Sequence, residues 1–69
     1  MIFYAIKNRR NGRYLSGTDF RSAPPRQILC DTYHPPRLFS GAEIVHELRH
    51  REVNMKTYKV EAVQVKAVE

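Results

Sequence analysis

Residues 46–50 match the pattern of a zinc peptidase, His-Glu-Leu-Arg-His. On a helix, this spacing places two histidines one turn apart, where they can hold a zinc ion, and the glutamate serves as a base. A catalytic zinc site also needs a third protein ligand and a cleft that shapes the substrate. The direction in which such a helix points its histidines decides whether the pattern can be used for hydrolysis.

A helix over this segment is predicted to turn both histidines away from the core. At about 100° per residue, Ile44, Val45 and Leu48 form one apolar stripe, centred about 45° from Ile44. His46 and His50 fall near about 200° and about 240° on the same wheel, roughly opposite that stripe. We therefore expect two solvated histidines that titrate near neutral pH and are open to a partner or an adventitious metal ion.

Other enzyme chemistry finds little support in the sequence. The three glycines are scattered rather than gathered into a phosphate-binding loop. Cys30 and His34 are four residues apart, but nothing in the sequence orients the histidine toward the thiol. We expect a non-enzymatic protein with no cofactor and no resident metal, and keep a zinc hydrolase as a remote alternative.

The excess positive charge lies in the first half of the chain. Residues 1–37 carry the whole net charge of +5, because they contain seven basic and two acidic groups. Residues 38–69 contain five basic and five acidic groups and are neutral overall. Arginine binds phosphates and carboxylates through paired hydrogen bonds, and aromatic rings beside it offer stacking surfaces for bases. The candidate ligand-binding residues are Arg9, Arg10, Arg13, Tyr14, Phe20, Arg21, Arg26, Tyr33 and Arg37.

Several partners fit such a surface. An anionic nucleotide would use both the arginines and the rings, and an acidic protein surface would be anchored by the same residue types. A small DNA- or RNA-binding regulator is the alternative, although the neutral second half offers no basic helix for the major groove. No apolar run approaches the about 20 residues that cross a bilayer, and the start lacks the features of a signal peptide. With a single cysteine, the chain is expected in a reducing cytoplasm, away from membranes.

The elements that must position these residues begin with a predicted hairpin. Residues 2–6 are rich in β-branched and aromatic side chains, Asn11-Gly12 is typical of a two-residue turn, and residues 13–16 form the returning strand. Two proline pairs bracket residues 26–33, which excludes a long helix there and leaves either a short edge strand over residues 27–30 or a loop of about twenty residues.

A helix and a long strand complete the chain. Ser40 and Glu43 form a capping box that starts the helix, and Asn54 is expected to end it in a left-handed conformation. In the strand over Thr57–Val68, the apolar residues change face near residues 62–63, which indicates a bend or two packing surfaces and suggests a homo-oligomer. The expected fold is a single α+β domain over residues 1–69, a small antiparallel sheet with the helix on one face.

A resemblance to a known group is carried by short motifs. Residues 12–17, Gly-Arg-Tyr-Leu-Ser-Gly, and residues 36–40, Pro-Arg-Leu-Phe-Ser, precede the helix, and the chain is similar in this order to small accessory proteins of phages and prophages of enteric bacteria. The resemblance implies a protein that acts stoichiometrically inside an infected host, countering its defence by blocking a protein or sequestering a signal molecule. It implies no site residues.

Overall fold

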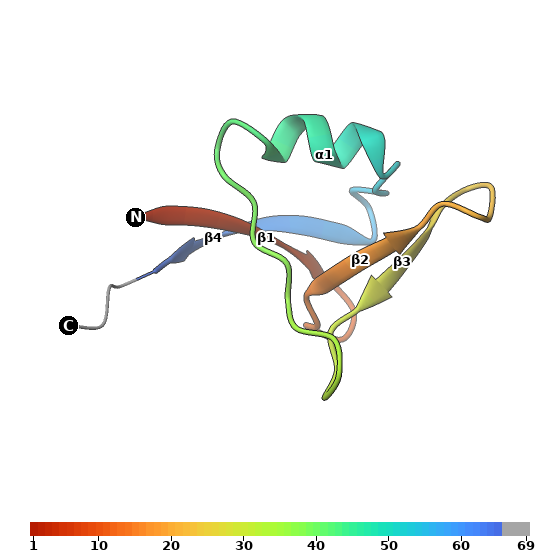
Figure 1. The fold of residues 1–69 in the computed structure, drawn as a ribbon, viewed down its shortest axis with the longest axis horizontal. Helices are drawn as coiled ribbons and strands as arrows, with labels where there is room; N and C mark the ends of the chain where they lie inside the picture. The colour runs from red at the N-terminus through yellow and green to blue at the C-terminus, as the bar shows by residue number, and fades with distance from the viewer. Residues whose placement is uncertain (66–69) are drawn as a thin grey trace.

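The computed structural model describes residues 1–65 and has a small α+β fold, as predicted (Figure 1). Its four strands pair into two small antiparallel sheets, and its helix lies over one face of the longer sheet. The predicted end of the last strand, residues 66–68, lies outside the described residues. The elements are β1 (Ile2–Asn8), β2 (Leu15–Asp19), β3 (Arg26–Leu29), α1 (Ile44–His50) and β4 (Tyr58–Gln64).

The first sheet pairs the two ends of the chain. β1 and β4 run antiparallel from Ile2 opposite Gln64 to Asn8 opposite Tyr58, without a register shift. The change of face in β4 therefore needs no bulge, because its two halves pack against different surfaces. Tyr58 joins the core under α1, whereas Val63 lines an apolar cavity on the opposite face.

The predicted N-terminal hairpin is wrong in its pairing, since β1 and β2 lie in different sheets. A single bridge between Lys7 and Tyr14 joins the two strands. The side chain of Asn8 accepts hydrogen bonds from the backbone N–H of the next turn residues, at 2.9 Å from Arg10. This wider turn requires a positive φ only at Gly12 (73°). It releases β1 to pair along its whole length with β4.

The second sheet is formed by β2 and β3, which lie on either side of the first proline pair. β2 pairs with β3, with a register shift between Leu15 and Gly17, which confirms the short strand predicted between the proline pairs. Thr18 and Gln27 are directly opposite each other, and the Thr18 hydroxyl donates to Gln27 Oε1 at 2.7 Å.

The core is small and lies between the sheets and the helix. Its fully or nearly buried apolar side chains are Ile6, Leu15, Phe39 and Ile44, whereas Ala5 is buried on the opposite face beside the cavity that Val63 lines. Phe39 reaches the core because its backbone N–H and carbonyl both bond to Tyr4, at 2.8 Å each. This contact between Tyr4 and Phe39 is a single antiparallel bridge, which covers the edge of β1 that faces away from β4.

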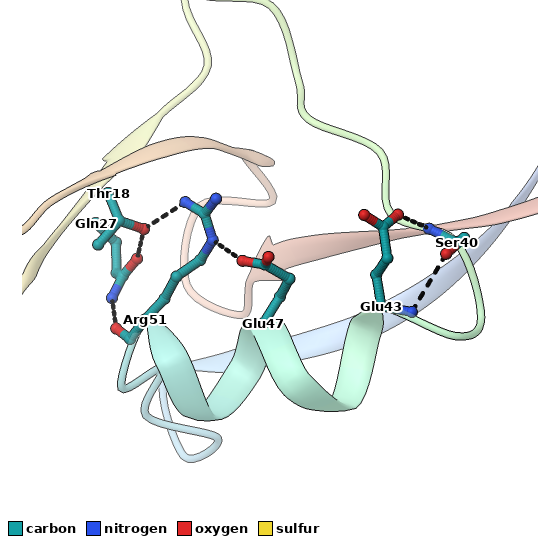
Figure 2. A network of polar contacts seen from close by, with 6 residues as sticks. All are labelled: Thr18, Gln27, Ser40, Glu43, Glu47 and Arg51. Atoms are coloured by element: carbon teal, nitrogen blue, oxygen red, sulfur yellow. Dashed lines mark hydrogen bonds and ion pairs between the residues drawn. The ribbon is translucent and has the colours of Figure 1, made fainter.

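Both ends of the helix region are held by specific hydrogen bonds. The predicted capping box precedes α1, with Glu43 N–H 3.2 Å from Ser40 Oγ and Ser40 N–H 3.0 Å from Glu43 Oε1 (Figure 2). At the other end, Glu52 takes the left-handed conformation (φ 49°), which corrects the prediction of Asn54. The N–H of Glu52 bonds to the Arg49 carbonyl, and the next N–H bonds to the Leu48 carbonyl, completing a Schellman motif.

Candidate anion-binding site

The histidine pair of the zinc-peptidase pattern is exposed, as the helical wheel predicted. The rings of His46 and His50 stack with their centroids 6.0 Å apart. Glu47 turns toward Arg51, whose Nε donates to its carboxylate at 2.8 Å, and this bond lowers the pKa of Glu47. Within residues 1–65, no three metal-binding side chains come together. Glu47, the glutamate of the pattern, is thus bound to the guanidinium of Arg51 and is not available as a base beside the histidines.

Arg51 is the residue whose position the sequence did not reveal. Its side chain is buried, with Nη1 2.9 Å from Thr18 Oγ1, and its carbonyl accepts a bond from Gln27 at 2.7 Å (Figure 2). This network rotates the buried face of α1 toward Glu47 and Arg51. In consequence Val45, which the wheel assigned to the core, is 60 % exposed.

Some of the nine candidate residues have structural partners. Arg21 makes two hydrogen bonds to Asp19, both 3.0 Å, and they lower the pKa of that carboxyl. The Tyr14 hydroxyl donates to Glu61 at 2.8 Å, which raises the pKa of the tyrosine. The guanidinium of Arg37 lies over the Phe39 ring, 5.5 Å from its centroid.

The remaining candidates are spread over the surface. Phe20 packs against the His50 ring at 5.0 Å, Tyr33 is 88 % exposed, and Arg10 is exposed on the turn after β1. Arg9 donates through Nε to the Tyr58 carbonyl at 3.1 Å, which ties this turn to the start of β4. These positions do not converge on one place.

Two of the arginines do converge, on a cavity along β2 and β3. It has a volume of about 520 Å³, and its lining residues are Arg13, Asp19, Arg26, Gln27, Ile28, Leu29 and His34. Gly17 stands opposite Ile28 in the register, and no atom lies within 4 Å of the place a Cβ would take there. The open space beside Gly17 leaves room along the sheet for a flat group.

The charge of this cavity is positive. Neither Arg13 nor Arg26 makes a side-chain ion pair or hydrogen bond with the residues that the structure describes. The one carboxylate in the lining, Asp19, is neutralised by Arg21. His34 has its Nδ1 2.8 Å from Asp31 Oδ1, and this contact lowers the pKa of Asp31.

His34 was not among the predicted ligand-binding residues. The side chain of Asp31 accepts bonds from the backbone N–H of Tyr33 and of His34, both 2.8 Å, and so fixes the local turn together with the ring. With Nδ1 directed at Asp31, the second ring nitrogen of His34, Nε2, is not used in that contact. An aspartate three residues before the histidine was the signal in the sequence.

A second basic cavity lies at the turn after β1. Its volume is about 350 Å³, and it is lined by Lys7, Asn8, Arg9, Gly12 and Lys59. Lys7 pairs with Glu61 at 3.3 Å, whereas Arg9 Nε donates only to neutral backbone carbonyls and Lys59 makes no ion pair among the described residues. The cavity on β2 and β3 is the larger of the two, and its lining also includes the apolar side chain of Ile28.

Comparisons with known proteins leave the site to be judged from its own chemistry. The chain matches no protein-family model, no curated protein and no solved structure. The resemblance to phage accessory proteins thus remains a prediction that rests on short motifs. In the described part of the chain, no helix has the length and apolar character needed to span a membrane.

Proposed function

We propose that the chain is a non-enzymatic binding protein that holds an anionic, nucleotide-type ligand in the cavity on β2 and β3. The observation that carries this proposal is the presence of Arg13, Arg26 and His34 around one cavity whose lining carboxylate, Asp19, is paired with Arg21. Guanidinium groups bind phosphate oxygens through charge-assisted hydrogen bonds. Ile28 supplies an apolar surface for a base, and the open space beside Gly17, which is opposite Ile28, leaves room for it.

The shape of the site favours a small ligand over an acidic protein surface. Its volume of about 520 Å³ lies within the range of small-molecule pockets, and it is concave. An acidic protein would instead use side chains outside the cavity, such as Arg10 and Tyr33. The two carboxylates nearest the cavity, Asp19 and Asp31, are bound to Arg21 and His34, so each is occupied in a structural contact.

The biological role that fits such a protein is sequestration. In this proposal the chain is a phage accessory protein of the infected host's cytoplasm, which counters defence by binding a nucleotide signal one to one. A sequestering protein needs affinity and abundance but no turnover, and this suits a small chain with a basic cavity. The role rests on the resemblance and on the charge of the first half.

Isothermal titration calorimetry against cyclic and linear nucleotides, with inorganic phosphate as a reference, tests the proposal. Replacing Arg13 and Arg26 together by Ala is expected to weaken binding by about tenfold or more for each arginine, because each removes a charge-assisted hydrogen bond. The matched control is Arg10→Ala with Arg49→Ala, which removes the same charge from exposed positions outside the cavity.

Two outcomes would overturn the proposal. In the first, no nucleotide binds, or the Arg13/Arg26 variant binds as tightly as the unaltered chain. In the second, a single-stranded oligonucleotide binds and both double variants lose affinity equally. General positive charge would then carry the binding, and the nucleic-acid alternative would replace the nucleotide proposal.

A further inference from the structure

The outer edge of β4 carries backbone groups without a partner among residues 1–65. Hydrogen bonds between the first and last strands join odd-numbered residues, as in Val65 N–H to the Met1 carbonyl at 2.9 Å and Arg9 N–H to the Thr57 carbonyl at 2.8 Å. In an antiparallel ladder the intervening residues direct their N–H and C=O groups to the opposite side. On β4 these intervening residues are Tyr58, Val60, Ala62 and Gln64.

The corresponding groups on β1 are already used. Tyr4 exchanges both of its backbone bonds with Phe39, and Asn8 N–H donates to the Arg13 carbonyl at 2.8 Å. β1 is therefore covered on its second side by residues of the same chain. On β4, Val60, Ala62 and Gln64 have no such cover in the described part of the chain, and β4 is an extended strand of seven residues without proline. Edges of this kind are templates for pairing with another chain.

We propose that two copies of this chain form a symmetric dimer in which their β4 strands pair antiparallel about Ala62. The β1-β4 sheets of the two copies then become one sheet with the strand order β1-β4-β4-β1. Two-stranded ribbons are marginal in water, and further strands raise their stability. Among residues 1–65 the core cluster has only four buried apolar side chains, which adds to the gain from pairing.

The edge itself limits the register of such a dimer. With the two-fold axis at Val60, Ala62 would face Tyr58 of the second copy. Tyr58 cannot complete that pair, because its N–H donates to the Asn54 carbonyl at 2.9 Å and its carbonyl accepts from Arg9. The free part of the edge is therefore the segment that contains residues 60, 62 and 64.

Two-fold axes at Glu61 and at Ala62 differ in the charges they bring together and in the hydrogen bonds they allow. An axis at Glu61 would place two glutamates directly opposite each other, and like charges at that position destabilise a sheet. An axis at Ala62 pairs Val60 with Gln64 on each side, so the N–H and C=O groups of all three free residues are bonded. Glu61 then lies opposite Val63, and the small side chain of Ala62 stands on the axis.

The partner is a second copy because self-pairing about Ala62 bonds all three free residues and places no like charges opposite each other. The three outward residues of the free segment pair with the same three residues in reverse order, and neither charged residue of β4 meets a like charge directly. Each Glu61 keeps its bonds to Lys7 and Tyr14 on its own chain. The interface does not involve the cavity on β2 and β3, so a test of the dimer and a test of nucleotide binding can fail independently.

Cysteine cross-linking tests directly which residues of the two β4 strands lie opposite each other. In a Cys30→Ser background, which removes the one native thiol, Ala62→Cys is expected to form a disulfide-linked dimer under mild oxidation. Directly paired residues have Cα atoms about 5.5 Å apart, within the range that a disulfide spans. Glu61→Cys and Val60→Cys are the matched variants, and efficient cross-linking at either of them instead of at Ala62 would overturn the register.

Sedimentation analysis tests the dimer without a cross-link. The unaltered chain is expected to have twice the monomer mass, and Ala62→Pro to become monomeric, because proline removes the outward N–H on the axis while leaving the bonds to β1. Ala62→Ser keeps the N–H and should remain dimeric. A monomer of the unaltered chain over about a hundredfold range of concentration would overturn the proposal. If Ala62→Pro fails to fold, the Ala62→Cys cross-link decides.

Discussion

Arg51 joins the helix to the second sheet through both its side chain and its backbone. The guanidinium binds Glu47 and Thr18, lies 5.4 Å from the centroid of the Phe39 ring, and is 7 % exposed as a residue. A planar fork with several donors suits this set of contacts better than a lysine ammonium does. At the scale of single residues, Arg51 and not the histidine pair is the centre of the polar structure around α1.

Replacing Arg51 by Met is expected to lower the free energy of unfolding by about 1–3 kcal/mol, since it leaves the partly buried Glu47 carboxylate and the Thr18 hydroxyl without their donor. Arg51→Lys should recover only part of this loss. The control is Arg49→Met, an exposed arginine on the same helix, for which a change within about 0.5 kcal/mol is expected. Urea unfolding measures all three, and equal effects at the two positions would contradict the role given to Arg51.

The carboxylates of Glu47 and Glu61 make stability depend on acid pH. Hydrogen bonds from Arg51 and from Tyr14 lower the pKa values of the two groups in the folded state. Such groups contribute stability that is fully present above the unfolded pKa and is lost as the pH falls through the folded pKa. The free energy of unfolding should therefore decrease below about pH 5.

Glu47→Gln separates this effect from general acid denaturation. The variant is expected to be less stable at pH 7, because Arg51 loses its anion, and to show a weaker decrease between pH 7 and the acid range. Urea unfolding at a series of pH values gives both quantities. Parallel curves for the variant and the unaltered chain would show that the Glu47–Arg51 pair does not contribute to the pH dependence.

At the scale of elements, the C-terminal end of α1 carries a conformational cost. Glu52 occupies a left-handed conformation (φ 49°) that glycine adopts without steric penalty. We expect Glu52→Gly to raise the free energy of unfolding by about 0.5–1 kcal/mol. Glu52→Ala removes the same charge but keeps Cβ, so it should not stabilise. Thermal unfolding distinguishes the two, and a gain from alanine equal to that from glycine would contradict the backbone explanation.

Local chemistry made several elements predictable. The capping box of Ser40 and Glu43, the short strand between the proline pairs and the exposure of the histidines all follow from neighbours a few residues apart. The pairing of strands did not follow, because the bonds of β1 to β4 join residues more than fifty positions apart. The rotation of α1 that exposes Val45 also depends on distant residues, namely Thr18 and Gln27.

In the candidate site, too, some residues were predictable from the sequence and others depended on distant contacts. Arginine content identified Arg13 and Arg26, which do share a cavity. The sequence could not show that Arg21 is taken up by Asp19, or that Arg9 is bound to carbonyls near β4. His34 enters the site only because the turn after β3 brings it beside the sheet, where Asp31 orients its ring.

At the scale of the whole molecule, the two sheets serve separate purposes. β2 and β3 carry the basic cavity of the proposed ligand site, whereas β1 and β4 carry the edge of the proposed dimer. The helix and Arg51 hold the two sheets together. In a dimer joined through β4, both cavities would stay open, and each complex would bind two ligands.

The central claim is that a nucleotide-type anion binds between Arg13, Arg26 and His34. Its most direct test is a two-dimensional NMR titration of the isotopically labelled chain with the tightest nucleotide from the calorimetric screen. The largest shifts are expected in the backbone amides of Arg13, Ile28 and His34, with little change at Lys59. Shifts centred instead on the turn after β1, or spread evenly over the chain, would contradict the claim.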